Sequence, residues 1–196
     1  MLLRRLAVPG IVLALAVTLA ACGSDDSSSA NTAAGGSVAT ASLNAADIEF
    51  AQGMIAHHEQ AIEMAEIALD PNVGAGPAVI NLATRIKGAQ DSEVELMTGW
   101  LTAAGEPVAM DAAEGHDMSS MEGMMTAEQM DSMAAMSGTD FDQIWLQTMI
   151  AHHKGAVSQS QVVKANGSNA DVLALADTIM NAQQAEITEM QALLQG

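Results

Sequence analysis

The chain has 196 residues, of which 24 are acidic and only six basic, and its formal net charge at pH 7 is −18. This charge excludes nucleic acid as a natural partner, because almost no cationic side chains are present to neutralise phosphates. The single cysteine, Cys22, excludes an internal disulfide, so a hydrophobic core must stabilise the fold.

Residues 1–21 have the pattern of a signal peptide. Arg4 and Arg5 precede an apolar run, Ile11 to Ala20, that is too short to span a membrane comfortably. The following Leu19-Ala20-Ala21-Cys22 resembles the cleavage site of bacterial lipoproteins. We therefore expect lipidation at Cys22 and anchoring to the outer face of the cytoplasmic membrane, or elsewhere in the cell envelope. The alternative is a plain secretory signal with an incidental cysteine.

Residues 22–43 are rich in Ser, Ala, Gly and Asp without periodicity, which predicts a flexible tether. A helical domain is then expected over 44–196. Asn44 with Asp47 predicts the cap of a first helix, and Thr139 or Asp140 the start of the first helix of the second half. Long amphipathic helices are predicted at 44–69, 77–103, 139–166 and 170–194. This pattern, without strand signals, predicts an all-α protein, an antiparallel four-helix bundle.

The bundle is expected to arise from two duplicated helical hairpins, with halves at about 44–104 and 139–196. Met-Ile-Ala-His-His occurs at 54–58 and again 95 residues later, at 149–153. The pattern Gln90-x-x-Glu93 returns as Gln183-x-x-Glu186. Helical periodicity places one histidine of each pair centrally on an apolar face and the other at its edge. The central ones are His58 and His153, and the edge ones are His57 and His152.

Two interpretations of this repeated set are open. In one, His58 and His153 form a buried polar network with Glu93 and Glu186. In the other, the histidines bind a metal together with Met54 and Met149, and thioether plus imidazole favours copper, as Cu(I) or Cu(II). The predicted metal ligands are Met54, His57, His58, Met149, His152 and His153, supported by Gln90, Glu93, Gln183 and Glu186. Histidine ligation predicts loss of metal as the pH falls through the imidazole range.

The linker between the halves, 105–138, is rich in methionine. Possible further copper ligands are His116, Met118, Met121, Met124 and Met125. The alternative is a hydrophobic flap that packs over the bundle, and the two are compatible. Thr126 to Gln129 predicts a capping box that opens a short helix to about Met136.

An enzyme is the less favoured interpretation. Di-iron and di-manganese bundles use Glu-x-x-His motifs, and this chain has none. No nucleophile constellation stands out either. The alternatives to copper binding are a ferritin-like metal-dependent oxidase or ferroxidase, and an envelope interaction module without metal.

The paired Met-Ile-x-His-His motifs resemble those of the bacterial "domain of unknown function 305" family, as do Phe141-Asp142-x-x-Trp145-Leu146 and residues 124–130. The resemblance implies a ferritin-like bundle that is exported or membrane-anchored, with copper binding or copper tolerance in some members. It transfers to the six predicted ligands, and less directly to His116 and the linker methionines. Gln159 and Ser160 stand where the first half has Met64 and Ala65, which implies a weaker second site. We expect an anchored copper-sequestering protein whose partners are a metal ion and the membrane, with a possible homo-oligomer.

Overall fold

The computed structural model describes residues 42–110 and 121–195. The predicted signal peptide, Cys22, nearly all of the tether, and His116 and Met118 of the linker lie outside the described residues.

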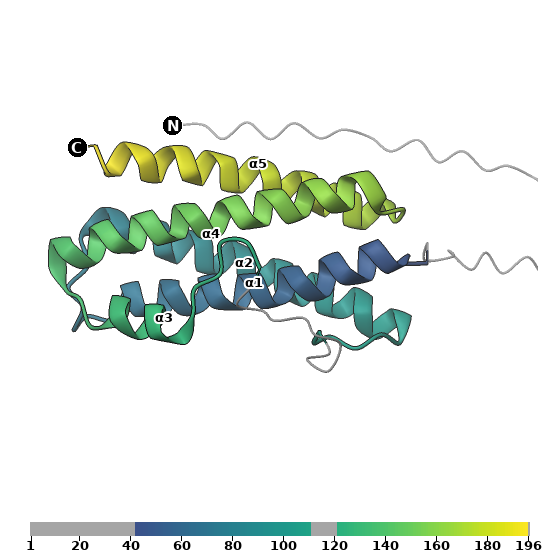
Figure 1. Cartoon of the computed structure of the whole chain (residues 1–196), viewed down its shortest axis with the longest axis horizontal. Helices are drawn as coiled ribbons and strands as arrows, with labels where there is room; N and C mark the ends of the chain where they lie inside the picture. Colours follow the sequence, from purple (N-terminus) through teal and green to yellow (C-terminus); the bar gives the residue numbers. More distant parts are fainter. Residues whose placement is uncertain (1–41, 111–120, 196) are drawn as a thin grey trace, which may run out of the picture. The chain divides into compact units, whose positions relative to one another are not determined.

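The described residues form five α-helices and no strand, so the all-α prediction is confirmed (Figure 1). Four of the helices are long. The helices are α1 (Ala45–Leu69), α2 (Pro77–Ala104), the short α3 (Ala127–Ala134), α4 (Gly138–Asn166) and α5 (Ala170–Leu193).

Local sequence explains most helix ends. A capping box of Asn44 and Asp47 opens α1, and one of Thr126 and Gln129 opens α3, both as predicted. The predicted start of α4 at Thr139 or Asp140 is wrong, because α4 begins at Gly138. Ser137 makes no side-chain cap there; instead the Gly138 amide donates to the carbonyl of Val73, 2.9 Å away. A tertiary contact thus replaces the local cap.

The helices pack as two antiparallel hairpins, α1 on α2 and α4 on α5, which meet through α1 and α4. Each hairpin turn is held by an aspartate from the other hairpin. Asp47 of α1 accepts hydrogen bonds from the amides of Ser168 and Asn169 ahead of α5. Its repeat counterpart, Asp142 of α4, accepts from the Gly76 amide ahead of α2 through both oxygens, at 3.0 Å each. The duplication therefore produces reciprocal contacts between the hairpins.

The core consists of two apolar clusters. One surrounds Trp145, whose indole N–H donates to the Met64 carbonyl at 2.9 Å, and the other surrounds Phe50. On each long helix the predicted polar site residues lie, in sequence, between the residues of one cluster and those of the other. The polar residues thus form one layer inside the bundle.

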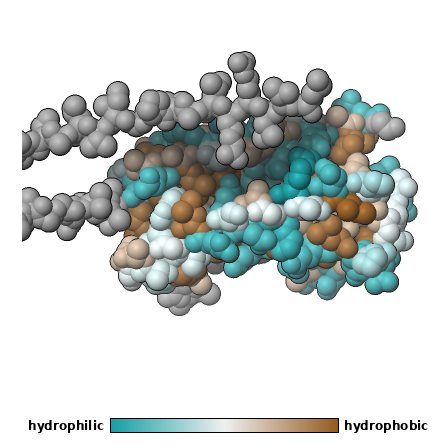
Figure 2. All heavy atoms as spheres, turned by 180° about the vertical axis from the view of Figure 1, so that it is seen from behind, coloured by the Kyte–Doolittle hydropathy of each residue, from teal (hydrophilic) through white to brown (hydrophobic). Residues whose placement is uncertain are grey.

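Outside this core the surface is mixed. Figure 2 shows hydrophilic and hydrophobic residues interspersed on one face, as expected for helices whose apolar stripes face inward. No helix of the described residues is both long and apolar enough to cross a membrane.

Candidate metal centre

Four imidazoles form a buried layer in the middle of the bundle, which we call the histidine layer: His57, His58, His152 and His153. Each has an exposed fraction of at most 1%. His57 and His152, expected at the edge of the apolar face of each helix, are thus buried as fully as the two central histidines. They face the opposite hairpin, and a segment of the linker covers them.

His57 and His152 meet across the interface of α1 and α4. Their ring centroids are 3.8 Å apart and the ring planes are inclined by 43°. Neither nitrogen of either ring makes a hydrogen bond to a described residue. Unsatisfied buried polar groups are uncommon and cost about 1–3 kcal/mol each, so this pair needs a chemical explanation.

His58 and His153 have a different environment, which is the same in both halves. Nε2 of His58 lies 2.7 Å from Oε2 of Glu93, and Nε2 of His153 lies 2.8 Å from Oε2 of Glu186. The polar network foreseen from the sequence is therefore present. It leaves Nδ1 of both rings buried and without a hydrogen bond to a described residue. A carboxylate on one ring nitrogen is also the usual support for a histidine that binds metal through the other.

The buried glutamines complete this layer. Gln90 and Gln183 are each 3% exposed, and the side-chain oxygen of each has no hydrogen-bond donor among the described residues. They lie one turn before Glu93 and Glu186 on the same helices. Their burial confirms the prediction that Gln90 on α2 and Gln183 on α5 face inward.

Burial keeps the imidazoles of His57 and His152 neutral. The pKa of His57 falls from 6.5 to about 3, mainly because of desolvation, with further lowering by His58 and His153. The backbone of Glu122, which approaches the ring, partly offsets this lowering. The pKa of His152 also lies well below 6.5, again mainly because of burial. For these two rings the lowered pKa predicts that protons compete with a metal only at lower pH than for an ordinary histidine.

Residues 121–125 of the linker, which we call the strap, cover His57 and His152. The Gln60 side chain holds the strap on one side: its amide donates to the Met125 carbonyl at 2.8 Å and accepts from the Met125 amide at 2.7 Å. On the other side the Glu122 carbonyl lies so close to Gly155 that a Cβ there would overlap it. Gly123, at φ +86°, lies against the backbone of Ala151 and His152.

The strap contacts were not predicted from the sequence, although one signal was available. Gln60 and Gly155 stand at equivalent positions of the repeat, and a long amide replaced by glycine marks a place where two backbones approach.

The methionines divide into two groups. Met125 belongs to the core cluster around Trp145 together with two residues of α3, Met130 and Met133, as expected for a flap. Met121 instead lines a pocket between α1 and α4, together with Met110, which the sequence did not single out. Met54 and Met149 are fully buried, but each belongs to a different core cluster.

The donor types suit a soft or borderline metal, since they are imidazoles with free nitrogens and nearby thioethers. Within the part of the chain that the structure describes, no three His, Cys, Asp or Glu side chains are grouped to hold one ion. A complete ligand set drawn from the described residues would therefore have to include thioethers or a movement of side chains.

A family model described as "Domain of unknown function (DUF305)" matches residues 47–194. The chain belongs to this family. No curated protein sequence matches it. The motifs that carry the resemblance in the sequence all fall inside the matched range.

Solved structures of the DUF305 family are similar to this chain. A Deinococcus radiodurans fragment is 25% identical and covers 78% of this chain and 97% of its own, with a TM-score of 0.69. A Streptomyces coelicolor member described as a predicted secreted protein is 29% identical, covers 76% of this chain and 91% of its own, and also has a TM-score of 0.69.

A third relative is CopM, whose solved forms include Cu(II)-bound, Cu(I)-bound and silver-bound ones. The Cu(II) form is 31% identical to this chain and covers 76% of it and 95% of its own length, with a TM-score of 0.63. The chain is thus similar to a protein that has been crystallised with copper.

Proposed function

We propose that this DUF305 protein binds copper in the cell envelope and sequesters it, or hands it on, without catalysis. The observation that supports this most directly is the histidine layer. Six of its eight ring nitrogens are buried without a hydrogen bond to a described residue. A protein core rarely tolerates so many unsatisfied groups in one place unless a ligand satisfies them. The similarity to CopM names copper as the ligand to test first.

The proposed ligands are the imidazoles of both halves, with the thioethers of Met54 and Met149 one turn earlier on the same helices. His58 and His153 would bind through Nδ1, because Glu93 and Glu186 occupy Nε2. Neutral His57 and His152 keep a lone pair available for metal even in mild acid. Gln90 and Gln183 would orient the rings.

The test is a titration of the whole chain with Cu(I) and with Cu(II) against a competing chelator. We expect stoichiometric binding by the wild type and a loss of at least about 100-fold in affinity in His58→Ala/His153→Ala. Val172→Ala is the control. It shortens a buried side chain of the core cluster around Phe50 and leaves every proposed metal ligand in place. Its copper binding should match the wild type. Wild-type affinity in the histidine variant would place the copper on the linker methionines instead.

Absence of turnover is part of the proposal. The inward carboxylates of the layer are Glu93 and Glu186, fewer than the four that di-iron bundles use. Adding Fe(II) or Cu(I) under air should leave oxygen uptake at the uncatalysed rate. Accelerated uptake that disappears in His58→Ala/His153→Ala would instead establish an oxidase.

We also propose that Cys22 carries the membrane anchor. Cys22→Ser should move the protein from the membrane fraction to the soluble fraction and abolish labelling with a radioactive fatty acid. Unchanged fractionation and labelling would refute lipidation at this residue.

A further inference from the structure

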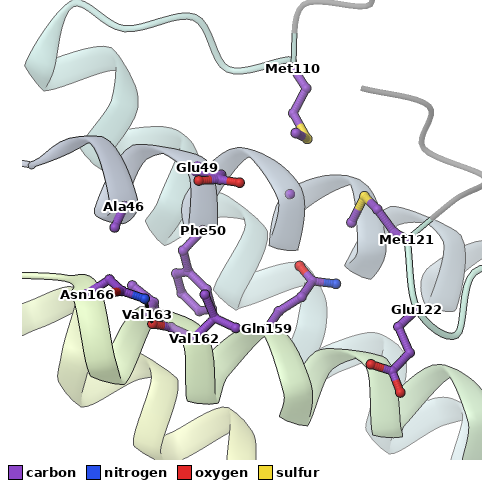
Figure 3. Close-up of a pocket in the computed structure, with 11 residues that line it drawn as sticks. Ala46, Glu49, Phe50, Met110, Met121, Glu122, Gln159, Val162, Val163 and Asn166 are labelled. Atoms are coloured by element: carbon purple, nitrogen blue, oxygen red, sulfur yellow. Dashed lines mark hydrogen bonds between the residues drawn. The ribbon is translucent and has the colours of Figure 1, made fainter. Parts of the chain in front are cut away.

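A pocket of about 390 Å³ lies between α1 and α4, beside the histidine layer (Figure 3). Most of its lining comes from these two helices. Met110, Met121 and Glu122 of the linker complete it. In Figure 3 both methionine side chains approach α1 from one side, while Gln159 reaches toward it from α4.

Three donor-bearing side chains converge on one point of this pocket, directly over Gly53. A Cβ placed on Gly53 would lie 3.8 Å from the sulfur of Met110 and 3.7 Å from the Cε methyl of Met121. The same point is 3.3 Å from Oε1 of Gln159. Glycine at this position leaves that space free, because a longer residue would fill it.

The chemistry of these groups selects one class of ligand. Thioethers are soft donors without a charge or a proton, and they favour monovalent ions such as Cu(I) and Ag(I) over Zn²⁺ or Mg²⁺. The Nε2 atom of Gln159 is buried without a partner among the described residues. The amide can therefore turn its oxygen toward the thioethers without losing a hydrogen bond made by that nitrogen. Glu49 and Glu122 also line the pocket, and their negative charge raises the local concentration of cations.

We propose that Met110, Met121 and Gln159 form a site for one soft monovalent cation, separate from the histidine layer. The proposal extends the copper-binding function proposed above, and it rests on that function. Gly53 lies one helical turn before His57 on α1, so an ion held over Gly53 would lie close to His57. The linker thus contributes two thioethers, in addition to the methionines that pack in the core.

The duplication provides only one such site. The repeat counterpart of Gln159 is Met64, which is fully buried in the core cluster around Trp145. The counterpart of Gly53 is Thr148, whose hydroxyl donates to the Ile144 carbonyl at 2.8 Å. We therefore expect one ion per chain at this site.

The test is a titration with Ag(I), a soft ion that does not change oxidation state, on the whole chain labelled with ¹³C at the methionine methyl groups. Chemical shifts then report each methionine separately. We expect the Met110 and Met121 signals to move and to saturate at one equivalent, while exposed Met136 stays unchanged. The same two signals should still move in His58→Ala/His153→Ala, so failure of the histidine proposal would not hide this site.

Two variants test the assignment. Met110→Leu/Met121→Leu should lose the silver equivalent while Met136→Leu, a control of the same chemistry, retains it. Gly53→Ala keeps both sulfur atoms but places a methyl group among them, and should weaken silver binding at least tenfold. Equal shifts of all methionines, or full silver binding by the double variant, would overturn the proposal. Loss of silver in the histidine variant alone would also overturn it, since all silver would then lie at the imidazoles.

Discussion

Gln60 and Gly155 occupy equivalent positions in the two halves, and they hold the same strap by opposite means. The long side chain of Gln60 forms two hydrogen bonds with the backbone of Met125, whereas Gly155 lets the Glu122 carbonyl approach its helix. The strap runs between them over His57 and His152. A near-symmetric bundle has in this way acquired an asymmetric cover over its histidine layer.

Gly155→Ala should therefore destabilise the protein. Its Cβ would overlap the Glu122 carbonyl, a backbone atom that cannot yield as a flexible side chain can. We expect a loss of about 1–3 kcal/mol in the free energy of unfolding, measured in urea. Gly88→Ala on α2 is the matched control, because a Cβ there meets nothing within 4 Å. Alanine in that exposed helix should be neutral or stabilise by up to about 1 kcal/mol. Equal effects of the two variants would show that the close approach has no energetic role.

Glu93→Gln/Glu186→Gln tests the carboxylates that contact His58 and His153. Glutamine retains the shape and a hydrogen bond but no longer accepts as an anion. If His58 and His153 bind copper, we expect an affinity lower by about 10–100-fold, because a ligating imidazole loses its charged support. The measurement is chelator competition with Cu(I) and Cu(II). Glu189→Gln, at an exposed position of α5, should leave copper affinity unchanged. An unaltered affinity in the double variant would identify the two contacts as purely structural.

Stability without metal should depend on pH through His57 and His152. The pKa of each is lower in the folded protein than the ordinary 6.5, so below that pH the unfolded chain binds more protons. The stabilising contribution is complete above about pH 6.5 and is lost as the pH falls toward the folded pKa, about 3 for His57. Each histidine should contribute a slope of about 1.4 kcal/mol per pH unit.

The measurement is urea unfolding at several pH values between 7.5 and 5. His57→Gln/His152→Gln removes both titrating groups, so its stability should fall less steeply than that of the wild type. Parallel slopes would mean that the two rings are accessible to protons in the folded state.

Asp47→Ala should destabilise the protein more than Asp142→Ala. Asp47 is fully buried and accepts from the Asn44 amide in addition to the donors before α5. Asp142 is half-buried and, among the described residues, accepts from Gly76 alone. Leaving these partly or fully buried amides unpaired should cost about 2–4 kcal/mol for Asp47 and about half of that for Asp142. Thermal unfolding of both variants provides the comparison. The reverse order would show that the turn before α2 limits the stability of the bundle.

The sequence alone predicted the four long helices and the inward-facing half of the histidine layer. Asn44, Thr126, Pro77 and Asn166 fix helix ends through contacts within a few residues, and such local effects can be recognised without a fold. Periodicity placed His58, His153, Glu93 and Glu186 inward, and the duplicated spacing of 95 residues predicted that the two halves would present the same groups.

The tertiary structure decided what depends on contacts between distant segments. His57 and His152 lie at the edge of an apolar stripe when each helix is considered singly, and they become buried only because the two hairpins and the strap close over them. Gly138 starts a helix because Val73, 65 residues earlier, accepts its amide proton. Met110 and Met121 both lie near Gly53 because two separate stretches of the linker return to α1. Helical periodicity describes one helix at a time, whereas burial and ligand geometry are properties of several helices packed together.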